Sequence, residues 1–274
     1  MNLIYQYWDG NWNESIPNSV KEMKAYAKRI GADYIFDKNP KVLKNHFKTD
    51  IGVGDYWTHY SCLRPVFDRS FDKYEKTLYV DLDIFPVDGL TENIFDDFHG
   101  EIGICTEPEQ PRLRRKTACH RVNHENDEKY AKMCKDVFGV DLPRNRYGID
   151  VFNCGLEMFS REGRIKARKL FNHPKEYFNA LSSIEGGINP WYYCDQPYFT
   201  LMMFLHDFDV QLLDNGWNSY VHYYRAKGDE HRTLCDWRDA NTKFVHCQFL
   251  KSIIDSKALW KIVNLPKESW NLHE

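Results

Sequence analysis

Two β-prone runs separated by an amphipathic segment occupy the start of the chain, and this order restricts the fold more than any other feature. The β-prone runs are Leu3 to Trp8 and Ala32 to Phe36. Between them, apolar residues recur at helical spacing after a capping-box pattern formed by Ser19 and Glu22, and Gly31 is placed to end the helix. A strand, a helix and a strand in succession build a parallel sheet covered by helices. The sequence therefore predicts an α/β fold whose central sheet is mixed, mostly parallel and flanked by helices.

A pair of aspartates directly follows a later strand signal. Thr77 to Val80 is rich in β-branched and aromatic residues and ends in Asp81-Leu82-Asp83. Ligands of open α/β sheets gather beyond the carboxyl ends of strands. Two carboxylates at positions i and i+2 of a turning chain can face one cation, and such hard oxygen ligands suit Mg²⁺ or Mn²⁺ next to a diphosphate. The same pattern at Asp207 and Asp209 follows a helical segment, where a solvated turn is the better interpretation.

The length and composition fit one globular domain. The chain has 274 residues, 42% of them hydrophobic, which is enough for a single buried core. Two regions are expected to lie outside that core. Residues 107–146 begin with a cluster of bases and little apolar periodicity, which predicts a lid or insertion, and residues 252–274 are expected to form a C-terminal tail.

Charge and targeting signals exclude some classes of protein. The net charge of −3 gives no reason to expect nucleic acid as a partner. The chain shows neither a signal peptide nor an apolar run near the roughly 20 residues that span a bilayer, so we expect no transmembrane segment. The eight cysteines lack zinc-type spacing, which favours free thiols in a reducing compartment and a cytoplasmic location.

The sequence around the acidic pair resembles a known group of enzymes. Leu78 to Ile84 is similar to the strand end of GT-A fold glycosyltransferases that bears the DxD motif, and the opening Tyr5 to Gly10 is closer to related sugar transferases of the mannosyltransferase type. Three later segments resemble, in order, those of glycosyltransferase family 8, the glycogenin and bacterial galactosyltransferase-like group. These segments are Phe152-Asn153-Cys154-Gly155-Leu156, Asp195-Gln196, and Phe244-Val245-His246 followed by Lys251.

The resemblance implies a GT-A fold and a metal-dependent transfer of sugar from a nucleotide-diphosphate donor, such as a UDP-sugar, to a saccharide or other hydroxyl acceptor. It implies that Asp83 and His246 bind Mn²⁺ or Mg²⁺ and that Asp81 contacts the metal or the ribose. It places the remaining binding residues as follows: Arg64 and Lys251 on the diphosphate, Tyr7 and Asp9 near the base, and Asn153 on the donor sugar or acceptor. The family spacing departs at Lys251, which lies five residues after His246 without the family's intervening glycine.

Several of these residues also have a purely structural interpretation. His246 can be a hydrogen-bonded core histidine, and Asn153 can be a polar kink in a packed strand, where Gly155 permits a bulge or a close backbone approach. Asp195 and Gln196 are the candidates for stabilising positive charge at the anomeric carbon, next to an aromatic segment that includes Trp191. Asp195 can equally cap the helix that follows.

Stereochemistry and rival functions stay open at this stage. Family 8 resemblance implies retention, in which the departing phosphate takes the acceptor proton, whereas Asp195 acting as a general base would give inversion. The motif Asp81-Leu82-Asp83 also fits a haloacid-dehalogenase-like phosphatase. A third possibility is a non-catalytic protein that binds a nucleotide sugar or carbohydrate on the same scaffold.

Overall fold

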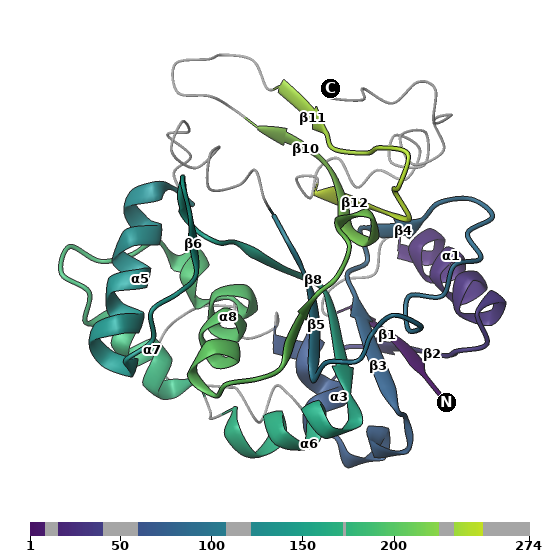
Figure 1. Ribbon diagram of the computed structural model, residues 1–274, viewed down its shortest axis with the longest axis horizontal. Helices are drawn as coiled ribbons and strands as arrows, with labels where there is room; N and C mark the ends of the chain where they lie inside the picture. Colours follow the sequence, from purple (N-terminus) through teal and green to yellow (C-terminus); the bar gives the residue numbers. More distant parts are fainter. Residues whose placement is uncertain (9–15, 41–59, 108–121, 172–173, 225–232, 249–274) are drawn as a thin grey trace.

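The structure is a computed structural model that describes residues 1–8, 16–40, 60–107, 122–171, 174–224 and 233–248 (Figure 1). It confirms the α/β class. Two sheets lie near each other, α1 (Ile16–Arg29) flanks one side of the larger sheet, and the helices α5 (His124–Phe138), α7 (Lys175–Ser182) and α8 (Asp195–Leu205) lie on the other side (Figure 1). Within the described ranges, no helix is long and apolar enough to cross a membrane.

The larger sheet has six strands and follows the expected mixed pattern. Its spatial order is β2 (Asp33–Lys38), β1 (Leu3–Trp8), β3 (Lys76–Val80), β8 (Phe152–Ser160), β5 (Ile102–Thr106) and β9 (Val210–Leu212). The pairs β1/β2, β1/β3 and β5/β9 are parallel, and β8 runs antiparallel to both of its neighbours. The opening strand, helix and strand therefore form the parallel unit that the sequence predicts.

The smaller sheet places late parts of the chain against an early one. Its order is β11 (Thr233–Asp236), β10 (Ser219–Tyr224), β12 (Phe244–Gln248) and β4 (Ile84–Pro86). Strand β4 begins immediately after the turn that ends β3, and it pairs antiparallel with β12. This pairing connects the acidic turn to a strand some 160 residues later in the chain.

The first helix corrects one detail of the sequence analysis. It is already helical at Ile16, so Ser19 lies inside the helix and the predicted capping box with Glu22 is wrong. Ser19 is buried, and its hydroxyl oxygen accepts a hydrogen bond of 3.3 Å from the Gln6 side chain of β1. Gly31 has a φ of +71°, the left-handed conformation that glycine adopts most readily, and it ends the helix as predicted.

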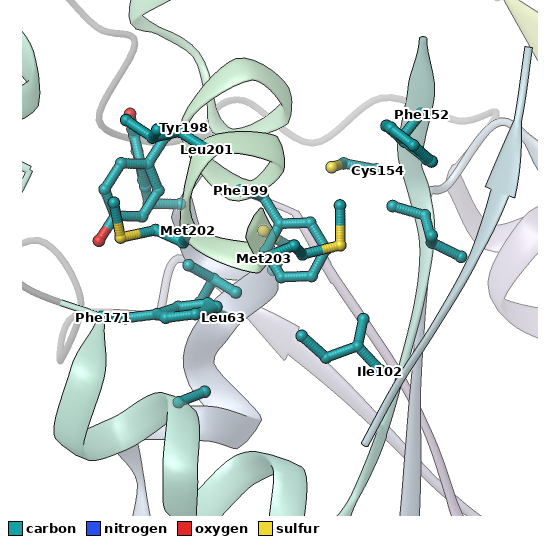
Figure 2. Packing of buried hydrophobic residues seen from close by; sticks show 14 of the residues in the cluster. Leu63, Ile102, Phe152, Cys154, Phe171, Tyr198, Phe199, Leu201, Met202 and Met203 are labelled. Carbon is teal, nitrogen blue, oxygen red and sulfur yellow. The ribbon is translucent and has the colours of Figure 1, made fainter. Parts of the chain in front are cut away.

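The largest apolar cluster joins the main sheet to the helices on the face opposite α1. Helix α8 presents buried side chains to β8 and β5, and Phe199 stacks edge-on against Phe159 and Phe171 at ring separations of 5.7 and 5.8 Å (Figure 2). The other described helices and short elements are α3 (Arg64–Phe67), α6 (Arg161–Leu170), the 3-10 turns Arg69–Lys73, Pro190–Tyr193 and Asn215–Asn218, and the strands Arg144–Asn145 and Gly148–Ile149.

Part of the region expected to form a lid belongs to this cluster. Helix α5 lies within residues 107–146, and its Tyr130, Met133 and Cys134 are buried in the cluster. Asn123 caps the helix by accepting a hydrogen bond from the backbone of Asn126. Residues 108–121 and 252–274, which include the basic cluster and the predicted tail, lie outside the described residues.

Candidate active site

The acidic pair lies in a tight turn at the carboxyl end of β3. The backbone N–H of Ile84 donates to the carbonyl oxygen of Asp81 at 3.2 Å and closes the turn. The backbone of Asp81 is held from the neighbouring strand by the Gly155 carbonyl at 2.7 Å, and the carbonyl of Asp83 accepts from the Cys247 N–H at 2.8 Å. Both aspartates therefore sit on backbone that is fixed from two other strands.

His246 reaches the turn from β12. It is the register partner of Ile84, and its Nε2 lies 3.3 Å from Oδ1 of Asp83. Asp81, Asp83 and His246 each offer one potential ligand atom, and these three atoms all lie within 4.8 Å of one another. The structure thus brings together the three side chains that the resemblance implies as metal ligands, and their role in binding metal stays a prediction.

The imidazole is oriented by an asparagine behind it. The distance between His246 Nδ1 and Asn218 Oδ1 is 2.9 Å, and the same asparagine donates through Nδ2 to Asn153. An amide oxygen only accepts hydrogen bonds, so the bond assigns the proton to Nδ1 of the imidazole. In the neutral ring, Nε2 then has a free lone pair on the side of Asp83, which is what a metal ligand requires.

A buried chain of polar groups continues away from the cluster of Asp81, Asp83 and His246. Asn153 donates to Oε1 of Glu107 at 2.7 Å, and the hydroxyl of Tyr220 donates to the same oxygen at 3.0 Å. The ring of Tyr220 also stacks on His246 at a centroid separation of 5.1 Å. Sequence reasoning missed Glu107, Asn218 and Tyr220, because isolated polar residues have no recognisable motif.

The side chain of Asn153 makes three hydrogen bonds to other protein groups. Besides donating to Glu107, its Oδ1 accepts from the Gly155 N–H and from Asn218, both at 2.9 Å. It therefore lies one step behind His246, and it supports the imidazole through Asn218. Its predicted contact with the donor sugar or the acceptor stays a prediction.

Gly155 allows the cluster to close. A Cβ at this position would lie 2.7 Å from Cε1 of His246, 2.8 Å from Oδ1 of Asn153 and 2.9 Å from Oδ2 of Asp81. The register of β8 against β5 also skips here, from Glu157 to Asn153, so the glycine lies in a bulge. The bulge and the close approach that the sequence suggested for Gly155 both occur, and the space beside this backbone is filled by the cluster itself. The donor set and this close approach fit a small hard cation.

The charges of the cluster depend on one another. Burial and the neighbouring Asp83 raise the pKa of Asp81 to about 7. Burial by itself would lower the pKa of His246, but the Asp83 carboxylate raises it, and the net shift is upward. Two carboxylates held this close repel each other, and a divalent cation would relieve that repulsion.

Stacked tyrosines form the wall beside Asp81. The hydroxyl of Tyr79 donates a short hydrogen bond to Oδ1 of Asp81, and the ring of Tyr79 stacks on Tyr7 at 5.6 Å. Gln6 donates to the main-chain carbonyl of Asp81 at 3.2 Å. Tyr7 is therefore close to the acidic turn, and its predicted contact with a nucleotide base stays a prediction.

Asp195 and Gln196 form the start of α8. Asp195 is the first residue of the helix, and the N-cap residue is Cys194, so the structure does not use Asp195 as the N-cap. Its carboxylate accepts a hydrogen bond of 3.7 Å from the Cys62 thiol. Gln196 lines a small hollow with Trp191 and Tyr192 of the preceding turn.

The other predicted binding residues divide into two groups. Arg64 lies at the start of α3, where its guanidinium pairs closely with Asp37 and at 3.3 Å with Asp68. Those carboxylates raise the pKa of Arg64 despite the opposing effect of burial. Its contact with a diphosphate stays a prediction. Asp9 and Lys251 lie outside the described residues.

Comparison with solved structures reveals the fold. Mouse xyloside xylosyltransferase 1 matches 90% of this chain and 97% of its own, with a TM-score of 0.52 and 15% identity. The chain has the GT-A glycosyltransferase fold. The galactosyltransferase LgtC, solved with donor and acceptor sugar analogues, matches 98% of each chain at 13% identity and a TM-score of 0.47. No protein-family model matches this GT-A chain, and neither does any curated protein sequence.

Proposed function

We propose that this GT-A protein is a metal-dependent glycosyltransferase that transfers a sugar from a nucleotide-diphosphate donor, with UDP-sugars the first candidates, to a carbohydrate or other hydroxyl acceptor. The observation that supports it most is the convergence of Asp81, Asp83 and His246 at the carboxyl end of β3. Open α/β sheets bind their ligands at such strand ends, and the fold is shared with mouse xyloside xylosyltransferase 1, which is named for sugar transfer.

Asp81, Asp83 and His246 would hold Mn²⁺ or Mg²⁺. Bound there, the cation would neutralise the charge that grows on the diphosphate as the bond to the sugar breaks. The protein holds the ligands in place through the turn after β3, through the bond between Asn218 and His246, and through the close backbone of Gly155. Preorganised ligands of this kind need no rearrangement when the donor arrives.

We assign the oxygens of Asp195 and Gln196 to stabilisation of positive charge at the anomeric carbon. Both residues begin α8, and Asp195 is close enough to Asp81 for their charges to interact. Retention is the proposed outcome, because the departing phosphate can take the acceptor proton and no separate base is needed.

The test is Mn²⁺-dependent hydrolysis of a panel of nucleotide sugars, followed by product anomer analysis with a hydroxyl acceptor. Asp83→Ala should lose turnover while its thermal unfolding stays near that of the wild type. Asp209→Ala is the matched control, because Asp209 is the exposed second aspartate of the Asp207–Asp209 pattern and belongs to neither candidate metal cluster of the described residues. An active Asp83→Ala enzyme would contradict the assignment.

Two other outcomes distinguish the rival functions. Cleavage of p-nitrophenyl phosphate with Mg²⁺, without any sugar release, would identify a phosphatase. Calorimetric binding of a nucleotide sugar without hydrolysis or transfer would identify a non-catalytic binding protein. Both results would contradict the proposed transferase.

A further inference from the structure

A second cluster of potential metal ligands lies beneath the start of α8. It consists of Cys62 in the turn just before α3, Glu157 from the middle of β8, and Asp195 at the start of α8. The sulfur of the cysteine and one oxygen of each carboxyl group all lie within 4.8 Å of one another. Three elements far apart in the sequence therefore direct a thiol and two carboxyl groups towards one point.

Glu157 is the member whose position calls for an explanation. It is fully buried, and in the part of the chain that the structure describes neither carboxyl oxygen has a hydrogen-bond partner of normal geometry. The thiols of Cys154 and Cys62 lie against it, but a thiol is a weak donor. Burial and the nearby Asp195 raise the pKa of Glu157 well above its usual range. A buried carboxyl group without partners is costly, and native proteins rarely retain one without a ligand or a function.

We propose that Cys62, Glu157 and Asp195 bind Zn²⁺, or a thiophilic divalent cation of the same size, at a site distinct from Asp81, Asp83 and His246. Bond lengths of about 2.0–2.3 Å in a tetrahedral zinc site place the ligand atoms about 3.3–3.8 Å apart. The distance of 3.7 Å between Sγ of Cys62 and Oδ2 of Asp195 agrees with this spacing. Zinc accepts mixed sulfur and oxygen ligands, and three protein ligands leave a fourth position open for water.

The two clusters differ in the cation that they favour. The first offers only nitrogen and oxygen atoms, which suit Mn²⁺ or Mg²⁺, whereas the thiolate of Cys62 selects a softer ion. Strand β8 contributes to both, with Gly155 against the first cluster and Glu157 in the second. Cys154 also directs its sulfur from β8 towards α8, and this adds a further thiol near the site (Figure 2).

Zinc bound at this site would also affect the active site, and this effect on sugar transfer rests on the proposed function. Asp195 is assigned there to the anomeric carbon, and a cation that engages its carboxylate would withdraw it. Zinc should therefore inhibit sugar transfer even when excess Mn²⁺ keeps Asp83 and His246 occupied, since the N and O ligands of that site can also take zinc. Binding of the cation itself does not depend on any transferase activity.

The test uses Co²⁺ as a spectroscopic substitute for zinc in the full chain. A cysteine ligand gives a thiolate-to-cobalt charge-transfer band in the near ultraviolet, and a site made of Asp81, Asp83 and His246 gives none. The wild type should show the band, and Zn²⁺ should abolish it by competition. Cys62→Ser should lose it, and Cys134→Ser, which alters a buried thiol of α5 outside the cluster, should retain it.

Two further variants separate this proposal from folding defects and from the proposed function. Glu157→Gln keeps the thiol and the shape of the side chain, and should weaken cobalt binding by at least about 100-fold, since even outer-shell partners contribute about 10–100-fold. Asp83→Ala should keep the band, because it belongs to the other cluster. Absence of the band in the wild type, its persistence in Cys62→Ser or its loss in Asp83→Ala would each overturn the site, whether or not the protein transfers sugar.

Discussion

A single methyl group at Gly155 should disrupt the proposed metal site of Asp81, Asp83 and His246. Ordinary carbon–carbon contacts are about 3.5–4.0 Å, whereas the new Cβ would lie 2.7 Å from Cε1 of His246. The imidazole would have to move by about 0.8 Å, several times the tolerance of about 0.2 Å on metal–ligand distances. The ring cannot move alone, because it is held by Asn218 and stacked on Tyr220.

The expected effect separates binding from stability. Gly155→Ala should lower Mn²⁺ affinity, measured by calorimetry, and donor hydrolysis by about 100-fold, the usual cost of a displacement near 1 Å in a catalytic group. Overpacking should also lower the free energy of unfolding by about 1–3 kcal/mol. Gly103→Ala is the matched control, because its Cβ would lie 3.0 Å from the ring of Phe98 in the core rather than against a ligand. It should lose stability and keep Mn²⁺ affinity.

The reasoning would be refuted if Gly155→Ala bound Mn²⁺ as tightly as the wild type. Equal losses of Mn²⁺ affinity in Gly155→Ala and Gly103→Ala would also refute it, since both would then act through general destabilisation of the sheet.

Three other substitutions test the site and the buried acid. His246→Ala should abolish or greatly weaken Mn²⁺ binding, and an unchanged titration would make His246 a core residue. Asn218→Ala should lower Mn²⁺ affinity by about 10–100-fold while keeping all three ligands, because it frees the imidazole to rotate; unchanged affinity would show that this bond is dispensable. The raised pKa of Glu157 means that the folded protein keeps a proton which the unfolded chain releases above the ordinary value of 4.5. With chelator present, the stability of the wild type should therefore fall with rising pH, by up to about 1.4 kcal/mol per pH unit until the folded-state pKa is passed. The melting temperature of Glu157→Gln should lack this decline, and parallel curves between pH 5 and 8 would contradict it.

Local signals predicted much of the fold. The β-prone run before Asp81, the helix stop at Gly31 and the solvated turn at Asp207 all depend on residues close in sequence, and each occurs as expected. The start of the first helix was placed too late, because Ser19 has the composition of a cap but is buried against Gln6. A contact between helix α1 and strand β1 overrides the capping pattern there.

The site could be predicted only as far as motifs extend. Asp81 and Asp83 follow from their strand, and His246 was found through resemblance. The support from Glu107, Asn218 and Tyr220 depends on how β10 and β12 pair, which no local pattern encodes. The second cluster was missed for the same reason, since cysteine spacing along the chain says nothing about Cys62 meeting residues about 95 and 133 positions later.

The pairing of β4 with β12 has a consequence for biosynthesis. Strand β4 lies within the first third of the chain, and the strand that supplies the histidine is among the last described segments to be made. While the ribosome is still translating, the nascent polypeptide has its acidic turn but lacks the histidine that we propose as the third metal ligand. Tight binding of Mn²⁺ should therefore appear only after β12 has been translated and the smaller sheet has assembled.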